Sequence, residues 1–85
     1  MNERAGRVSK WIEFVHWRET GKTSVWQVVT KDGGVVIGEV KWFGRWRGYA
    51  FFPKPDTIYE ATCLRDIADF IKAQMDARRV ARTIP

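Results

Sequence analysis

Apolar and polar residues alternate along much of the first 53 residues, and this period of two is typical of half-buried β-strands. Near the start, Ile12, Phe14 and His16 alternate with Glu13 and Val15. The pattern predicts four strands, at residues 10–18, 24–30, 35–43 and 49–53. Two prolines, at positions 53 and 55, end the last strand, because proline has no N–H to donate to a strand ladder.

Short segments that contain glycine separate the predicted strands. Residues 19–22 form the first turn, and residues 44–48 close the third hairpin. Between them, Asp32-Gly33 is a signal for a two-residue turn of type I′, since both positions tolerate a positive φ. Consecutive hairpins of this kind predict an antiparallel meander.

After residue 56 the apolar period changes to that of a helix. One apolar stripe follows the spacing i, i+3, i+4, i+7 and i+11, at Leu64, Ile67, Ala68, Ile71 and Met75. Thr62 is the expected N-cap of this helix, and the alternative is a capping box of Thr57 and Glu60 further upstream. The predicted fold is therefore α+β, with a four-stranded antiparallel sheet and one C-terminal α-helix on one of its faces. We expect a flexible basic arm at residues 1–9, a single domain at 10–79 and a tail at 80–85.

The predicted turns also set a register, with Val29 opposite Val36, Val25 opposite Val40, Trp42 opposite Tyr49 and Val40 opposite Phe51. Two faces result. The first holds Val25, Gln27, Val29, Val36, Gly38, Val40, Trp42, Tyr49 and Phe51, and the second holds Trp26, Val28, Thr30, Val35, Ile37, Glu39, Lys41, Phe43, Ala50 and Phe52. One helix covers one face. We expect it on the first, because the second carries Glu39 and Lys41, and an uncovered apolar face is typical of an interaction surface.

Length and charge narrow the class of protein. Eighty-five residues make one domain, and 15 Lys and Arg against 10 Asp and Glu give a net charge of +5. That charge favours acidic partners, nucleic acid first, although charge of this size also serves solubility alone. The single cysteine, Cys63, excludes an internal disulfide. With no apolar run of membrane-spanning length, we expect a cytoplasmic protein without a membrane partner.

Candidate catalytic chemistry is scarce. One His and one Cys cannot make a zinc site by themselves. His16 has the spacing of a sheet residue, and Cys63 that of a small apolar residue in the first helical turn. We therefore expect no enzyme activity, no catalytic residue, no metal, no cofactor and no small-molecule substrate.

Residues 39–54 concentrate aromatic and basic side chains, with six of the twelve aromatic residues and four bases. One hypothesis is a nucleic-acid-binding module built on this hairpin. The residues that would contact phosphate are Lys41, Arg45, Arg47 and Lys54. The residues that would stack on bases are Phe43, Trp46 and Phe52. If their face of the sheet is open, Trp42, Tyr49 and Phe51 would stack as well. The other hypothesis is a protein-interaction module, either a homodimer or a small protein docked on a different protein, because Trp, Tyr and Arg are typical of interface hot spots.

Part of this hairpin resembles the first hairpin of cold-shock domains. The likeness lies in G-E-V-K-W-F at residues 38–43 and G-Y-A-F-F at residues 48–52. In that family the hairpin presents a Trp and two further aromatics to single-stranded bases. The resemblance implies stacking by Trp42, Tyr49 and Phe51, with Lys41 on the phosphate backbone. It covers about 15 residues, and the helix that follows has no counterpart in the five-stranded cold-shock barrel.

A second resemblance covers more of the chain, from about residue 24 to residue 71. The run W-R-x-Y-x-F-x-P at residues 46–53, followed by C-L-x-x-I-x-x-F-I at residues 63–71, is similar to small uncharacterised proteins of phages and mobile elements. This resemblance implies the extent of the domain and a mobile-element origin. It implies no activity, and under the interaction hypothesis it implies a mobile-element protein that docks on a host protein.

Overall fold

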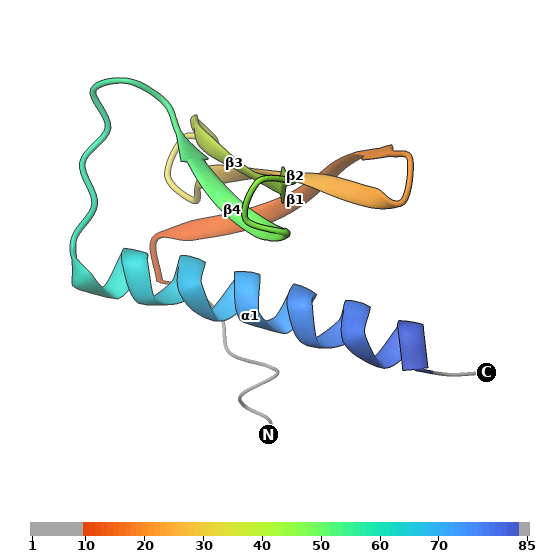
Figure 1. Ribbon diagram of the computed structural model, residues 1–85. Coiled ribbons are helices and arrows are strands. Elements are labelled where there is room, and N and C mark those ends of the chain that lie inside the picture. Colours follow the sequence, from red (N-terminus) through yellow and green to blue (C-terminus); the bar gives the residue numbers. More distant parts are fainter. Residues whose placement is uncertain (1–9, 84–85) are drawn as a thin grey trace.

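A computed structural model of the chain describes residues 10–83 and has one sheet and one helix (Figure 1). The strands are β1 (Ile12–Thr20), β2 (Thr23–Thr30), β3 (Val36–Phe43) and β4 (Gly48–Pro53), and the helix is α1 (Ala61–Thr83). All neighbouring strands are antiparallel and follow the order β1-β2-β3-β4. This confirms the predicted α+β meander with a C-terminal helix. The helix runs past residue 79, and the expected arm at residues 1–9 lies outside the described residues.

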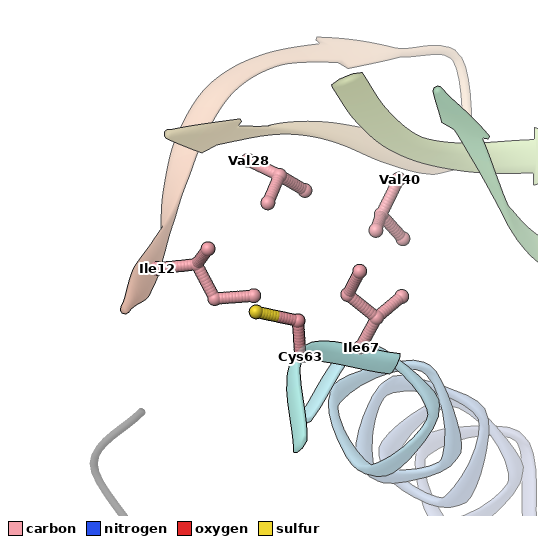
Figure 2. Close-up of a cluster of buried hydrophobic side chains, with 5 residues drawn as sticks. All are labelled: Ile12, Val28, Val40, Cys63 and Ile67. Carbon is pink, nitrogen blue, oxygen red and sulfur yellow. The ribbon is translucent and has the colours of Figure 1, made fainter. Parts of the chain in front are cut away.

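The helix lies along one side of the sheet, which we call the covered face (Figure 1). A small apolar cluster joins the two layers. Figure 2 shows Val28 and Val40 pointing from the sheet toward Cys63 and Ile67 on α1, with Ile12 beside them. Val28 and Val40 have no exposed surface, and Ile12 is only 2% exposed. Each fully buried Val or Ile side chain contributes about 1.5–3 kcal/mol through removal of apolar surface from water. These five residues therefore anchor α1 to the sheet.

The covered face agrees with the expected first face in β4 and in β3 from Gly38 onward, but not in β2 and not at Val36, which lies on the other side of the sheet with Val29. Val40 pairs with Phe51 and Trp42 with Tyr49, as the turns predicted. Val29 also pairs with Val36, but the register then shifts by one residue at Ile37, so that Trp26 rather than Val25 lies opposite Val40. Because side chains alternate, a one-residue shift exchanges the two faces of a strand. The expected faces of β2 were therefore wrong, and Trp26 and Val28 belong to the covered face.

The turn between β2 and β3 is longer than the predicted two-residue turn. The backbone N–H of Thr30 donates to the Val35 carbonyl at 2.9 Å, and the N–H of Gly34 donates to the Thr30 carbonyl at 3.0 Å. The positive φ angles fall on Gly33 (91°) and Gly34 (64°), and not on Asp32. Glycine takes both angles without the steric cost that a Cβ would add. The bulge at Ile37 follows directly after this wider loop.

Aromatic rings fill the space between the covered face and α1. Phe70 of α1 stacks on Phe14 with 4.1 Å between ring centroids, and it meets Trp26 edge-on at 5.2 Å. Tyr49 makes edge contacts at 5.4 Å with both Trp26 and Trp42. Such offset and edge-on pairs contribute about 0.5–1.5 kcal/mol each beyond their area.

Two features of the helix differ from the sequence prediction. The side chain of Glu60, and not that of Thr62, caps the N-terminus: its Oε1 accepts the Cys63 N–H at 2.6 Å. The buried stripe begins at Cys63 and Ile67, whereas Leu64 is 51% exposed. Leu64 has the helical spacing of a core residue, but the sheet meets the helix along a line rotated toward Cys63 and Phe70.

Candidate binding surface

The second side of the sheet, which we call the open face, is turned away from α1, and no helix among residues 10–83 lies over it (Figure 1). One row of paired residues crosses all four strands on this face: Val15 with Gln27, Gln27 with Glu39, and Glu39 with Phe52. By strand alternation and pairing the face is made of Glu13, Val15, Arg18, Val25, Gln27, Val29, Val36, Glu39, Lys41, Phe43, Ala50 and Phe52. Apolar side chains predominate, which is unusual for the solvent side of an antiparallel sheet.

Three of the predicted stacking residues lie in line on the open face. Phe43 meets Phe52 at 6.0 Å and Trp46 at 4.9 Å between ring centroids, both edge-on. Phe43 and Phe52 are half-buried, and Trp46 is 74% exposed. The Lys41 Nζ lies 4.7 Å from the centre of the Phe52 ring and 3.4 Å from a carboxylate oxygen of Glu39. The structure therefore brings together Lys41, Phe43, Trp46 and Phe52.

The loop between β3 and β4 carries two further predicted residues, Arg45 and Arg47. It is held by two backbone bonds of 3.1 Å, from the Trp46 N–H to the Phe43 carbonyl and from the Arg47 N–H to the Gly44 carbonyl. Arg47 has a φ of 56°, a left-handed conformation that is rare for residues other than glycine. Both arginines are exposed, so this tight loop places two cations at the end of the aromatic line.

The remaining predicted residues lie elsewhere. Lys54 follows β4 at the end remote from the loop, where its N–H donates to the Ile37 carbonyl at 2.9 Å. Trp42, Tyr49 and Phe51, proposed as stacking residues if their face is open, lie on the covered face. Their rings contact other side chains: the Arg78 guanidinium lies 4.4 Å from the Trp42 ring centre, and Tyr59 meets Phe51 at 5.3 Å. The condition for their stacking on bases is therefore not met in this structure.

The sequence reasoning missed two residues of β1, Trp17 and Arg18. His16 pairs with Trp26 and Arg18 with Val25, so Trp17 is an extra residue, a β-bulge. The Arg18 guanidinium lies 4.4 Å from the Trp17 ring centre, and both side chains are exposed. A signal was present in the chain, because Trp17-Arg18 repeats the dipeptide Trp46-Arg47 of the loop.

A cluster of His16, Glu19 and Ser24 has the residue types of a hydrolytic triad without its geometry. His16 Nε2 lies 2.9 Å from Glu19 Oε2, while the Ser24 hydroxyl donates to Glu19 Oε1 at 2.8 Å. A triad needs the histidine beside the serine oxygen, where it can take the proton. Here the carboxylate stands between them, and the hydrogen bond from Ser24 lowers the pKa of Glu19, with a second contribution from His16.

Cys63 is also unsuited to nucleophilic chemistry. Its side chain is 9% exposed and lies within the core cluster (Figure 2). Burial raises the pKa of the Cys63 thiol, and the neighbouring Glu60 carboxylate raises it further. A thiolate is the reactive form of cysteine, so both effects reduce reactivity. Among residues 10–83, no group of three His, Cys, Asp or Glu side chains could hold a metal ion.

Comparison with curated proteins identifies one relative that bears on origin. The chain is 31% identical to an uncharacterised 9.3 kDa protein of Acholeplasma phage L2 over 72 residues, which span 84% of this chain and 92% of the phage protein. The chain belongs to the family of this phage protein. This relationship agrees with the resemblance to small phage proteins. No protein-family description matches the chain, and no solved structure matches it. Within residues 10–83, α1 lacks the apolar length needed to cross a membrane.

Proposed function

We propose that this protein is a small nucleic-acid-binding module without catalytic activity, and that it binds through the open face and the β3–β4 loop. The observation that carries the proposal is the line of Trp46, Phe43 and Phe52, which has Lys41 beside it and Arg45 and Arg47 at its end. Aromatic rings offer surfaces on which bases stack, and cations neutralise phosphates. The net charge of +5 favours the same class of partner.

The two kinds of residue stand at the right places for these roles. Phe43 and Phe52 lie against the sheet with their positions set by strand pairing, so they form a fixed platform. Arg45 and Arg47 in the loop are exposed, so their side chains can follow the sugar-phosphate backbone of a bound nucleic acid. Lys41 lies between Phe52 and Glu39, where its charge is partly offset by the carboxylate. Most of the electrostatic attraction is therefore assigned to Arg45 and Arg47.

The test is a titration of labelled oligonucleotides with the purified protein at about 50 mM and about 200 mM salt. Binding should weaken steeply between the two concentrations, because phosphate contacts release counterions. The double variant R45A/R47A should lose binding and keep its thermal stability, since both side chains are exposed. Alanine keeps a Cβ at position 47, so the strain of the positive φ is unchanged.

A matched control is the single variant R65Q, which removes an exposed charge from the helix, on the far side of the sheet. It should bind as the unmodified protein does, apart from the small loss expected for one unit of net charge. A dissociation constant in the millimolar range or weaker at low salt, or one that does not change with salt concentration, would contradict the proposed function.

The alternative is a protein-interaction module, and one observation favours it. Two acidic residues, Glu13 and Glu39, share the open face with Val15, Phe43 and Phe52, and carboxylates repel phosphate. Analytical ultracentrifugation distinguishes a homodimer from a monomer. A dimer that is dissociated by F43D or F52D and that binds no oligonucleotide would replace the first proposal with this one.

A further inference from the structure

We infer that the ligand of the open face is single-stranded, and that the β-bulge in β1 adds a second aromatic–cation contact for it, made by Trp17 and Arg18. This inference rests on the proposed function and extends it in two ways. It names the class of nucleic acid, and it assigns a role to two residues outside the central hairpin.

The bulge decides which side of the sheet this pair occupies. Trp26 and Val25 are consecutive in β2 and so point to opposite faces, with Trp26 on the covered face. His16 pairs with Trp26 and Arg18 with Val25, so Arg18 lies on the open face. The ring of Trp17 lies against the Arg18 guanidinium at 4.4 Å. Without the extra residue, strict alternation would have sent Arg18 to the same face as His16.

The pair stands within reach of the aromatic line. Because Trp26 pairs with Val40, Val25 is next to Lys41 in the sheet, and Arg18 is next to Val25 on the other side. Two strand spacings, about 10 Å, therefore separate Arg18 from Lys41. Val25 between them is 3% exposed, so it contributes almost no surface of its own there. A chain of nucleotides can cross the strands from Trp46 and Phe43 to Trp17.

The form of these two sites favours unpaired bases. At both, an exposed Trp adjoins an Arg in the sequence: Trp17, 47% exposed, and Trp46, 74% exposed. A ring presented this way stacks on a base only if the π-face of the base is free, and a duplex buries those faces against neighbouring base pairs. Duplex grooves are read by a protruding helix or ribbon, whereas α1 lies on the covered side of the sheet (Figure 1). A phosphate-only contact with a duplex would leave Trp17 without a role.

The test measures fluorescence anisotropy with three labelled probes: oligothymidine, oligouridine and a duplex, each of about 20 nucleotides. This length exceeds the sites of about 4–16 nucleotides that single-strand-binding folds occupy. The variants are W17A, W17F and R18Q, and W11A is the matched control. Trp11 is 52% exposed with the Lys10 Nζ 5.2 Å from its ring centre, but it lies at the other end of β1. Thermal melts of all variants show whether each is folded.

We expect at least one of the two single strands to bind about tenfold more tightly than the duplex, consistent with the contribution of one stacked base. W17A should weaken this binding about tenfold, W17F should restore most of it, and W11A should leave it unchanged. R18Q should reduce the salt slope by about 0.7, the value for one phosphate contact on a single strand. A purely structural role of Trp17 would alter the melting temperature and leave the slope and the single-strand preference as they are.

Other results would overturn the inference in distinguishable ways. If R45A/R47A weakens binding while W17A and R18Q bind normally, the proposed function stands and the second contact is wrong. Duplex binding as tight as single-strand binding would show that the ligand class is wrong. Absence of binding to all three oligonucleotides would remove both the inference and the proposed function.

Discussion

The two faces of the sheet use aromatic rings in different ways. On the covered face, Phe14, Trp26 and Tyr49 contact one another or Phe70 of α1, and their contacts are complete within the fold. On the open face, Phe43 and Phe52 contact each other, the exposed Trp46 and the charged end of Lys41. Aromatic content alone therefore does not mark a binding site. The partner of each ring decides whether it stabilises the fold or remains available to a ligand.

The largest expected effect compares one tryptophan from each face. W26A should lower the free energy of unfolding by about 3 kcal/mol, near the lower end for loss of a large buried ring, because Trp26 contacts Tyr49, Phe70 and His16. W17A should cost less than about 1 kcal/mol, since its ring is 47% exposed. Chemical denaturation measures both. Equal costs for the two variants would break the distinction between the faces.

The second prediction concerns the close approach of β4 to β3 on the covered face. A Cβ at Gly38 would lie 2.6 Å from Cε1 of Phe51 and 2.8 Å from the Phe52 carbonyl oxygen. G38A should therefore destabilise the protein by about 2 kcal/mol through overpacking. G44A is the control, because a Cβ there meets nothing within 4 Å. If both variants unfold at the same denaturant concentration, the ring of Phe51 is not held against the sheet.

The third prediction concerns the start of the helix that makes one face covered. E60A removes the side chain that accepts the Cys63 N–H, and loss of an N-cap costs about 1 kcal/mol. E60S should recover most of that loss, since serine is a preferred N-cap residue. Thermal unfolding followed by circular dichroism measures both variants. The assignment of Glu60 as the cap is wrong if E60A melts at the temperature of the unmodified protein.

The smallest expected effect belongs to an exposed polar contact. The hydrogen bond from Ser24 holds the pKa of Glu19 below its usual value, so the contact stabilises the fold above the usual pKa of Glu, and this contribution is lost as the pH falls through the lower folded pKa. The melting temperature of the unmodified protein should therefore fall slightly more than that of E19Q between pH 6 and pH 3, a range that brackets the pKa of about 4.3 for a free Glu. Identical pH profiles would show that this contact contributes nothing. A loss as large as that of W26A would mean that solvent screening does not weaken it.

Most of the architecture could be predicted from local patterns. The period-two alternation placed all four strands to within two residues at each end, and the aromatic partners Trp42 and Tyr49 followed from the short loop between them. The error in β2 came from a bulge at Ile37. The adjacent Gly38 was a signal for it, because a glycine inside a strand often marks a bulge. Because a bulge moves every later side chain of the pairing by one position, a single residue put Trp26 on the wrong face.

The candidate site was predicted in part for the same reason. Lys41, Phe43, Trp46 and Phe52 lie in one hairpin, so its own turn sets their common face, and Arg45 and Arg47 lie in that turn. Trp17 and Arg18 reach the open face through a second bulge, whose presence depends on how β1 pairs with β2. Lys54 belongs to the same stretch of sequence but lies at the far end of β4, since a strand of six residues extends for about 20 Å.

Three properties follow from the order of the amino acids alone: the order of the elements, the concentration of aromatic and basic residues at 39–54, and the membership in a phage protein family. These properties depend on local residue spacing and composition, which do not change with the tertiary contacts of the chain. The tertiary structure decided which rings face α1 and which face outward, because two bulges and the rotation of the helix set those directions. Pairing between distant segments controls both, and no window of consecutive residues contains that information.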